Sequence, residues 1–143
     1  MRSWHGVVRG IRLTSTLVCG LALICVRATG DSSGQTSLNI YFQSTLKDQA
    51  YQQMTFKRVA AAWKAPEGAG FPKAGTKTVV QAVIAKDGRL VSTVISTGCG
   101  SKRWDAAVEK AVRAAAPYDA LPKDYKYPSL EAHFHMSYLA GAR

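Results

Sequence analysis

The chain has 143 residues, of which 47% are hydrophobic, enough for one buried core but not for two independent domains. Its formal charge of +10, from 19 Lys and Arg against 9 Asp and Glu, is compatible with anionic partners such as nucleic acids, membrane surfaces or acidic proteins. The basic residues are spread along the chain and do not cluster with aromatic residues, which argues against nucleic-acid binding.

The N-terminus has the features of an export signal. Arg2, Arg9 and Arg12 precede an uncharged stretch of 14 residues, Leu13 to Val26. A helix needs roughly 20 residues to cross a bilayer core, so this stretch is short for a membrane span. We therefore predict that residues 1–28 are a signal peptide, with a short signal anchor as the alternative. The protein would contact a membrane only if this segment is not cleaved.

Removal of residues 1–28 would change both the charge and the cysteine content. Residues 29–143 carry 15 basic and 9 acidic residues, a balance of +6. Cys19 and Cys25 would leave with the signal, so the mature chain would retain Cys99 alone and could not form an internal disulfide. We interpret Cys99, which lies between two glycines, as a small packed residue and not as a nucleophile.

A polar segment rich in Gly and Ser follows the predicted signal, and its lack of periodicity predicts a flexible linker over residues 29–43. The folded domain is then expected to span residues 44–143. Thr45 and Asp48 have the spacing of a capping box, which predicts a first helix that ends at Ala65-Pro66. Apolar residues recur along this helix at near-helical intervals, at Leu46, Ala50, Met54, Val59, Ala60 and Trp63.

Two strands and a tight turn give the strongest local signal. Residues 78–85 and 90–97 are rich in Val, Ile and Thr, and Asp87-Gly88 between them supplies the positive φ that a tight hairpin requires. Gly98-Cys99-Gly100 then turns the chain into a second helix, which Pro117 ends. The apolar side of this helix is expected to consist of Trp104, Ala107, Val108, Ala111, Val112 and Ala115.

The last predicted strand spans Ser129 to Tyr138. Leu130, Ala132, Phe134, Met136 and Tyr138 alternate along it with Glu131, His133, His135 and Ser137, as on a strand with one buried face. The predicted element order is helix, strand, strand, helix, strand. We therefore predict an α+β fold in which two helices cover one face of a three-stranded antiparallel sheet. The first strand would be central, and the last and second strands would be edges.

Residues that could carry chemistry are few. Glu131, His133 and His135 share one face of the last strand, and a His-x-His pair can bind zinc or copper with a third ligand from elsewhere. No other histidine lies in the mature chain, so we favour a polar outer face, with His133 and His135 as weak metal candidates. The sequence contains no nucleophile elbow, phosphate-binding Gly loop or evident catalytic carboxylate pair. We predict no cofactor and no enzymatic activity.

Several short motifs occur in a consistent order along the predicted domain. They are Trp63-x-x-Pro66, Asp87-Gly88-Arg89-Leu90, Cys99-Gly100, Trp104-Asp105-x-Ala107-Val108, Ala115-Ala116-Pro117-Tyr118 and Leu121-Pro122. In this order, and with the last strand, they resemble the C-terminal domain of the envelope energy transducers TonB and TolA. The resemblance covers residues 50–138, which is most of the mature chain.

The resemblance implies a periplasmic protein-interaction domain linked to energy-dependent transport or envelope integrity. Its partners would be envelope proteins, such as an outer-membrane receptor or components of the Tol and Ton type. In TonB, a partner strand is added to the edge of the sheet, where unpaired N–H and C=O groups are available. We expect partners to bind along Ser129–Tyr138, because this strand alternates cleanly and contains no proline.

One departure from the family concerns the N-terminal half. Its transducers have a membrane anchor and a long spacer, whereas Thr29 to Ser44 would span only about 55 Å when fully extended. A free periplasmic adaptor is therefore the expected form of the protein. The alternative from a different functional class is a small secreted protein that binds a ligand or a metal.

Overall fold

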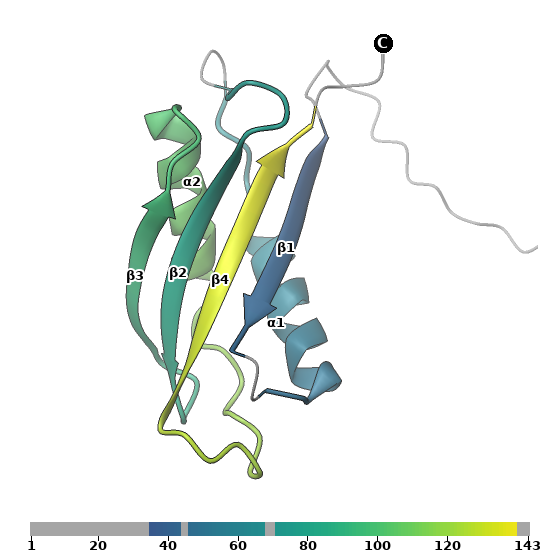
Figure 1. Cartoon of the computed structure of the whole chain (residues 1–143), viewed down its shortest axis with the longest axis vertical. Helices are drawn as coiled ribbons and strands as arrows, with labels where there is room; N and C mark the ends of the chain where they lie inside the picture. Colours follow the sequence, from purple (N-terminus) through teal and green to yellow (C-terminus); the bar gives the residue numbers. More distant parts are fainter. Residues whose placement is uncertain (1–34, 44–45, 68–70, 140–143) are drawn as a thin grey trace, which may run out of the picture. The chain divides into compact units, whose positions relative to one another are not determined.

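The computed structural model describes residues 35–43, 46–67 and 71–139, so the predicted signal peptide lies outside the described residues. The elements are β1 (Thr36–Phe42), α1 (Gln49–Ala62), β2 (Lys77–Ala85), β3 (Leu90–Thr97), α2 (Lys102–Ala114) and β4 (Ser129–Tyr138). Figure 1 shows one sheet with both helices on the same face, which confirms the α+β class. In these described ranges, neither helix is long and apolar enough to cross a membrane.

The sheet has four strands, in the order β1-β4-β2-β3, and not the predicted three. The additional strand, β1, lies in the segment predicted to be a flexible linker, of which residues 29–34 lie outside the described part. It pairs antiparallel with β4 from Thr36 opposite Tyr138 to Phe42 opposite Ala132. Leu38, Ile40 and Phe42 pack against the core, which explains why the segment is ordered as a strand.

β4 is therefore an inner strand, and the prediction that it forms an edge is wrong. It pairs with β1 on one side and with β2, antiparallel, on the other. The backbone groups that would have faced solvent along one side of β4 are instead paired with β1. β2 is central and β3 is an edge, as predicted, while β1 forms the second edge.

β2 and β3 form the predicted hairpin. Gly88 has a φ of 90°, and its N–H donates to the carbonyl of Ala85 at 2.9 Å. A Cβ at this position would collide with the carbonyl of Tyr118, whose own N–H donates to the Gly88 carbonyl at 2.9 Å. The turn therefore requires glycine both for its conformation and for close contact with the chain that follows α2.

α1 begins at Asp48, whose carboxylate accepts a hydrogen bond from the Tyr51 N–H at 2.9 Å. Its buried residues are Tyr51, Thr55 and Val59. The predicted apolar stripe is wrong in part for this helix, because Ala50, Met54 and Ala60 are exposed, whereas Leu46 and Val59 are buried as predicted. Thr55 can be buried because its hydroxyl donates to the Tyr51 carbonyl at 2.9 Å, so a polar residue stands where an apolar one was expected.

α2 begins at Ser101, and its buried residues, Trp104, Val108, Ala111 and Val112, belong to the predicted apolar side. Asp105 in its first turn accepts hydrogen bonds from the Thr78 hydroxyl at 2.6 Å and from the Cys99 N–H at 3.0 Å. Burial alone would raise the pKa of Asp105, but these hydrogen bonds hold the pKa below its ordinary value. This carboxylate therefore fixes the start of α2 to β2.

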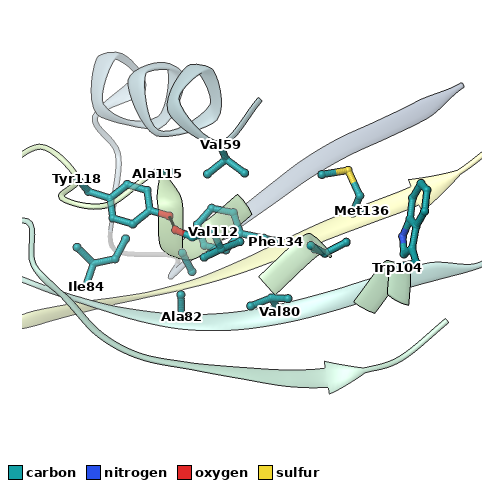
Figure 2. Close-up of a cluster of buried hydrophobic side chains, with 12 residues drawn as sticks. Val59, Val80, Ala82, Ile84, Trp104, Val112, Ala115, Tyr118, Phe134 and Met136 are labelled. Carbon is teal, nitrogen blue, oxygen red and sulfur yellow. Dashed lines mark hydrogen bonds between the residues drawn. The ribbon is translucent and has the colours of Figure 1, made fainter. Parts of the chain in front are cut away.

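The core lies between the sheet and the two helices. Figure 2 shows Val59 of α1, Val112 of α2 and Phe134 of β4 close to Val80 and Ala82 of β2. All five side chains are fully buried. The burial of Phe134 confirms the predicted inward face of the last strand.

We predict that Phe134→Ala lowers the free energy of unfolding by about 3–5 kcal/mol, because it removes a fully buried ring from the centre of the core. His133→Ala, one residue away on the half-buried outer face, should lower it far less. Urea denaturation of both variants measures the difference. Equal losses would contradict the assignment of the two faces of β4.

Candidate functional site

The two edge strands are the places where the sheet can accept another strand. Among the described residues, β1 and β3 each pair with one neighbour only. Their sequences, TSLNIYF and LVSTVIST, contain no charged residue and no proline. Lys and Pro are common means of protecting an edge against further pairing, so both edges of this sheet are chemically open to strand addition.

Two backbone hydrogen bonds at the ends of β1 determine which of its backbone groups face outward. The Gln43 N–H donates to the carbonyl of Glu131 at 3.1 Å, and the Leu139 N–H donates to the carbonyl of Gln35 at 2.7 Å. These pairs place the backbone groups of odd-numbered β1 residues toward β4. Because directions alternate along an antiparallel strand, the N–H and C=O groups of Leu38, Ile40 and Phe42 point away from the sheet.

A groove of about 350 Å³ lies beside this edge, between β1 and α1. It is lined by Ile40, Phe42, Gln49, Gln52, Gln53 and Phe56. Phe56 is 43% exposed although it is a large apolar residue. A strand added to β1 would direct alternate side chains toward this groove, where apolar and amide groups are available to contact them.

The opposite edge, β3, is exposed as well, but side chains beside it on the helix-covered face are already bonded to each other. Val91 and Val94 are largely exposed. On the helix side, the Thr93 hydroxyl donates to Glu109 of α2 at 2.8 Å. Glu109 also pairs with Arg113 at 2.8 Å, so its carboxylate already has partners. The edge of β1 therefore offers the more complete binding surface.

The predicted partner-binding strand, Ser129–Tyr138, is not available as an edge while β1 is in place. Its outer side chains instead form a polar row on the open face of the sheet. Glu131 accepts a hydrogen bond from the Gln81 amide at 2.8 Å and lies 2.8 Å from Nε2 of His133. The ring of His135 packs against that of Tyr41 on β1, with centroids 4.6 Å apart.

The weak metal candidates, His133 and His135, are not joined by a third ligand. Over residues 35–43, 46–67 and 71–139, no group of three or more His, Cys, Asp or Glu side chains could hold a metal ion. Burial lowers the pKa of His135, and the positive charges of Lys77 and His133 lower it further. Cys99 is free and half-buried in the described structure.

Strand β1 and the groove beside it were not predicted from the sequence, although one signal for the strand was present. Leu38, Ile40 and Phe42 alternate with Asn39 and Tyr41, which is the pattern of a strand with one buried face. No local signal marks the groove, because it depends on the placement of α1 against this strand.

A family model described as TonB C terminal matches residues 48–135 of the chain. The matched segment begins at the N-cap of α1 and ends within β4, so β1 lies outside it. No curated protein matches the chain. No solved structure matches it either.

We predict that Tyr41→Ala raises the pKa of His135 toward 6.5, because the tyrosine ring helps to bury the imidazole. NMR titration of the imidazole protons in the wild type and the variant measures this change.

A lowered pKa means that folded His135 binds fewer protons than unfolded His135 just below pH 6.5. The free energy of unfolding of the wild-type protein should therefore fall as the pH decreases below 6.5. An unchanged pKa in the variant would contradict the packing of β1 on β4.

Proposed function

The chain belongs to the TonB C-terminal family, and from this premise we propose that it is a protein-interaction domain of the cell envelope. The family is non-catalytic, and binding of envelope proteins is the activity that it implies. Partners bind by adding a strand to the outer edge of β1. The observation that carries the proposal is the outward direction of the backbone groups of Leu38, Ile40 and Phe42, next to the groove between β1 and α1.

The physical basis of such binding is main-chain hydrogen bonding. Each net hydrogen bond contributes about 0.5–1.5 kcal/mol, so a short ladder along β1 supplies affinity with little dependence on the sequence of the partner. Side chains that enter the groove between Ile40 and Phe56 supply selectivity, because apolar residues gain most from burial there.

The location that fits this function is the periplasm, reached by means of the export signal in residues 1–28. The proposed partners are an outer-membrane receptor or components of the Tol and Ton type, in a role in transport or envelope integrity. The protein would act as a free adaptor if the signal is cleaved. Nucleic acid is not among the proposed partners, because the basic residues are dispersed along the chain.

We predict that Ile40→Pro reduces recovery of envelope partners by about tenfold or more, in a protein that remains folded. The N–H of Ile40 points outward, so proline removes a donor for the added strand and leaves the bonds between β1 and β4 intact. A loss of one or two main-chain hydrogen bonds corresponds to about this reduction. Quantitative pull-downs from envelope extract measure recovery, and circular dichroism checks the fold.

Two controls make the result specific to this edge. Ile40→Ala truncates the same side chain but retains the N–H, so it should reduce recovery much less than proline does. Ile95→Pro places proline at an equivalent outward position on β3, since Ile95 is opposite Val80 in the register. If Ile95→Pro abolishes recovery and Ile40→Pro does not, the partner binds to β3 and the proposed edge is wrong.

A further inference from the structure

A second groove, separate from the edge of β1, lies between the end of α1 and the length of α2. Its volume is about 350 Å³. It is lined by Ala62, Lys64, Ala65, Pro66, Ala107, Lys110, Ala111 and Ala114. The floor is thus made of small apolar side chains, and the charged groups that line it are two lysines.

The groove exists because of how α1 ends. Trp63 follows the helix in an extended conformation, with φ −67° and ψ 128°, and its indole packs edge-on against Trp104 at a centroid distance of 5.1 Å. The chain from Lys64 to Pro66 then borders α2 instead of continuing as a helix. Since α2 presents alanines on this side, no large side chain fills the space.

The charges around α2 are segregated between its two sides. Both of its carboxylates lie toward the sheet, where Asp105 bonds Thr78 of β2 and Glu109 bonds Thr93 of β3. Lys110 lies on the other side and lines the groove with Lys64. No acidic residue is among the lining residues, and the adjacent Glu67 is exposed outside them. The groove is therefore apolar at its floor and positive at its rim.

We propose that this groove binds a short acidic peptide segment of a partner protein. One aliphatic side chain of the segment enters between the alanines, and carboxylates on either side of it pair with Lys64 and Lys110. Exposed ion pairs contribute little individually, so both the apolar contact and the charges are required for useful affinity. This surface is independent of the edge of β1 and does not require strand addition.

Charge complementarity favours an acidic peptide in this groove over two other occupants, the chain's own N-terminal segment and a second copy of the protein. The N-terminal segment of the chain itself carries four basic residues and no acidic residue up to residue 28, so the lysines would repel it. A second copy of the chain, with a formal charge of +10, would also meet long-range repulsion. An acidic segment with an aliphatic residue can pair its carboxylates with the lysines of the rim and place its aliphatic side chain against the alanines of the floor.

The test uses the purified protein and three fluorescein-labelled hexapeptides. The probe is Glu-Asp-Leu-Leu-Asp-Glu, and its controls are Glu-Asp-Ser-Ser-Asp-Glu and Lys-Lys-Leu-Leu-Lys-Lys. Fluorescence anisotropy gives each affinity, and ¹⁵N NMR maps the probe on the protein. We expect the probe to bind at least tenfold more tightly than either control, with amide shifts concentrated at Ala62, Lys64, Ala107, Lys110, Ala111 and Ala114.

Matched variants separate the groove from general charge attraction. Lys64→Glu combined with Lys110→Glu should weaken the probe at least tenfold, whereas Lys123→Glu with Lys126→Glu makes the same change in net charge outside the groove and should have little effect. Ala107→Phe fills the groove without a change of charge and should also weaken binding. Ile40→Pro should leave the affinity unchanged, which keeps this test distinct from that of the β1 edge.

Several outcomes would overturn the proposal. Equal binding of the serine peptide would mean that charge alone attracts the probe. Equal losses of affinity in Lys64→Glu with Lys110→Glu and in Lys123→Glu with Lys126→Glu would also mean that charge alone attracts the probe. Amide shifts confined to residues outside the groove would place the probe on a different surface.

Discussion

The pairing of β1 with β4 is the interaction on which the arrangement of this domain depends. It extends the sheet by one strand and turns β4, the longest strand, into an inner element with partners on both sides. The apolar residues of β4 from Leu130 to Met136 are buried, and Leu38, Ile40 and Phe42 of β1 pack beside this strand against the core. Without β1, the backbone groups along one side of β4 would lack partners, and Leu38, Ile40 and Phe42 would leave the core.

This pairing also determines where partners can bind. With β4 enclosed, the free edge of the sheet moves to β1, and α1 provides side-chain contacts next to it. The groove between the helices has a different origin, in the alanine-rich side of α2 and the exit of the chain after Trp63. One surface offers main-chain hydrogen bonds and the other offers an apolar floor with positive charges. A single small domain therefore presents two surfaces of different chemistry.

The parts of the fold that were predictable are those specified by residues close in sequence. Asp87-Gly88 determines the hairpin turn, and the regular stripe that begins at Trp104 identifies the buried side of α2. The face of α1 was not predictable in this way, because its buried stripe includes Tyr51 and Thr55. The Thr55 hydroxyl bonds the Tyr51 carbonyl one turn earlier, so a polar residue can occupy a buried position that an apolar pattern does not mark. β1 was overlooked because its polar, Gly-rich flank obscured a short alternating pattern.

The binding surfaces were less predictable than the elements. The groove between the helices brings residues 62–66 next to residues 107–114, and no local pattern encodes that contact. The edge predicted at β4 followed correctly from a three-stranded sheet, but the number of strands was wrong. An error of one strand therefore changed which strand forms the edge of the sheet, from β4 to β1.

Amide hydrogen exchange, followed by NMR without any partner, tests the central claim most directly. If β1 pairs with β4, the amides of Ser37, Asn39 and Tyr41 will be protected, whereas those of Leu38, Ile40 and Phe42 will exchange rapidly. The amides of Glu131, His133, His135 and Ser137, which face β1, will be protected as well. Rapid exchange throughout residues 36–42, together with rapid exchange at these four β4 positions, would show that β4 is an open edge and would contradict the account.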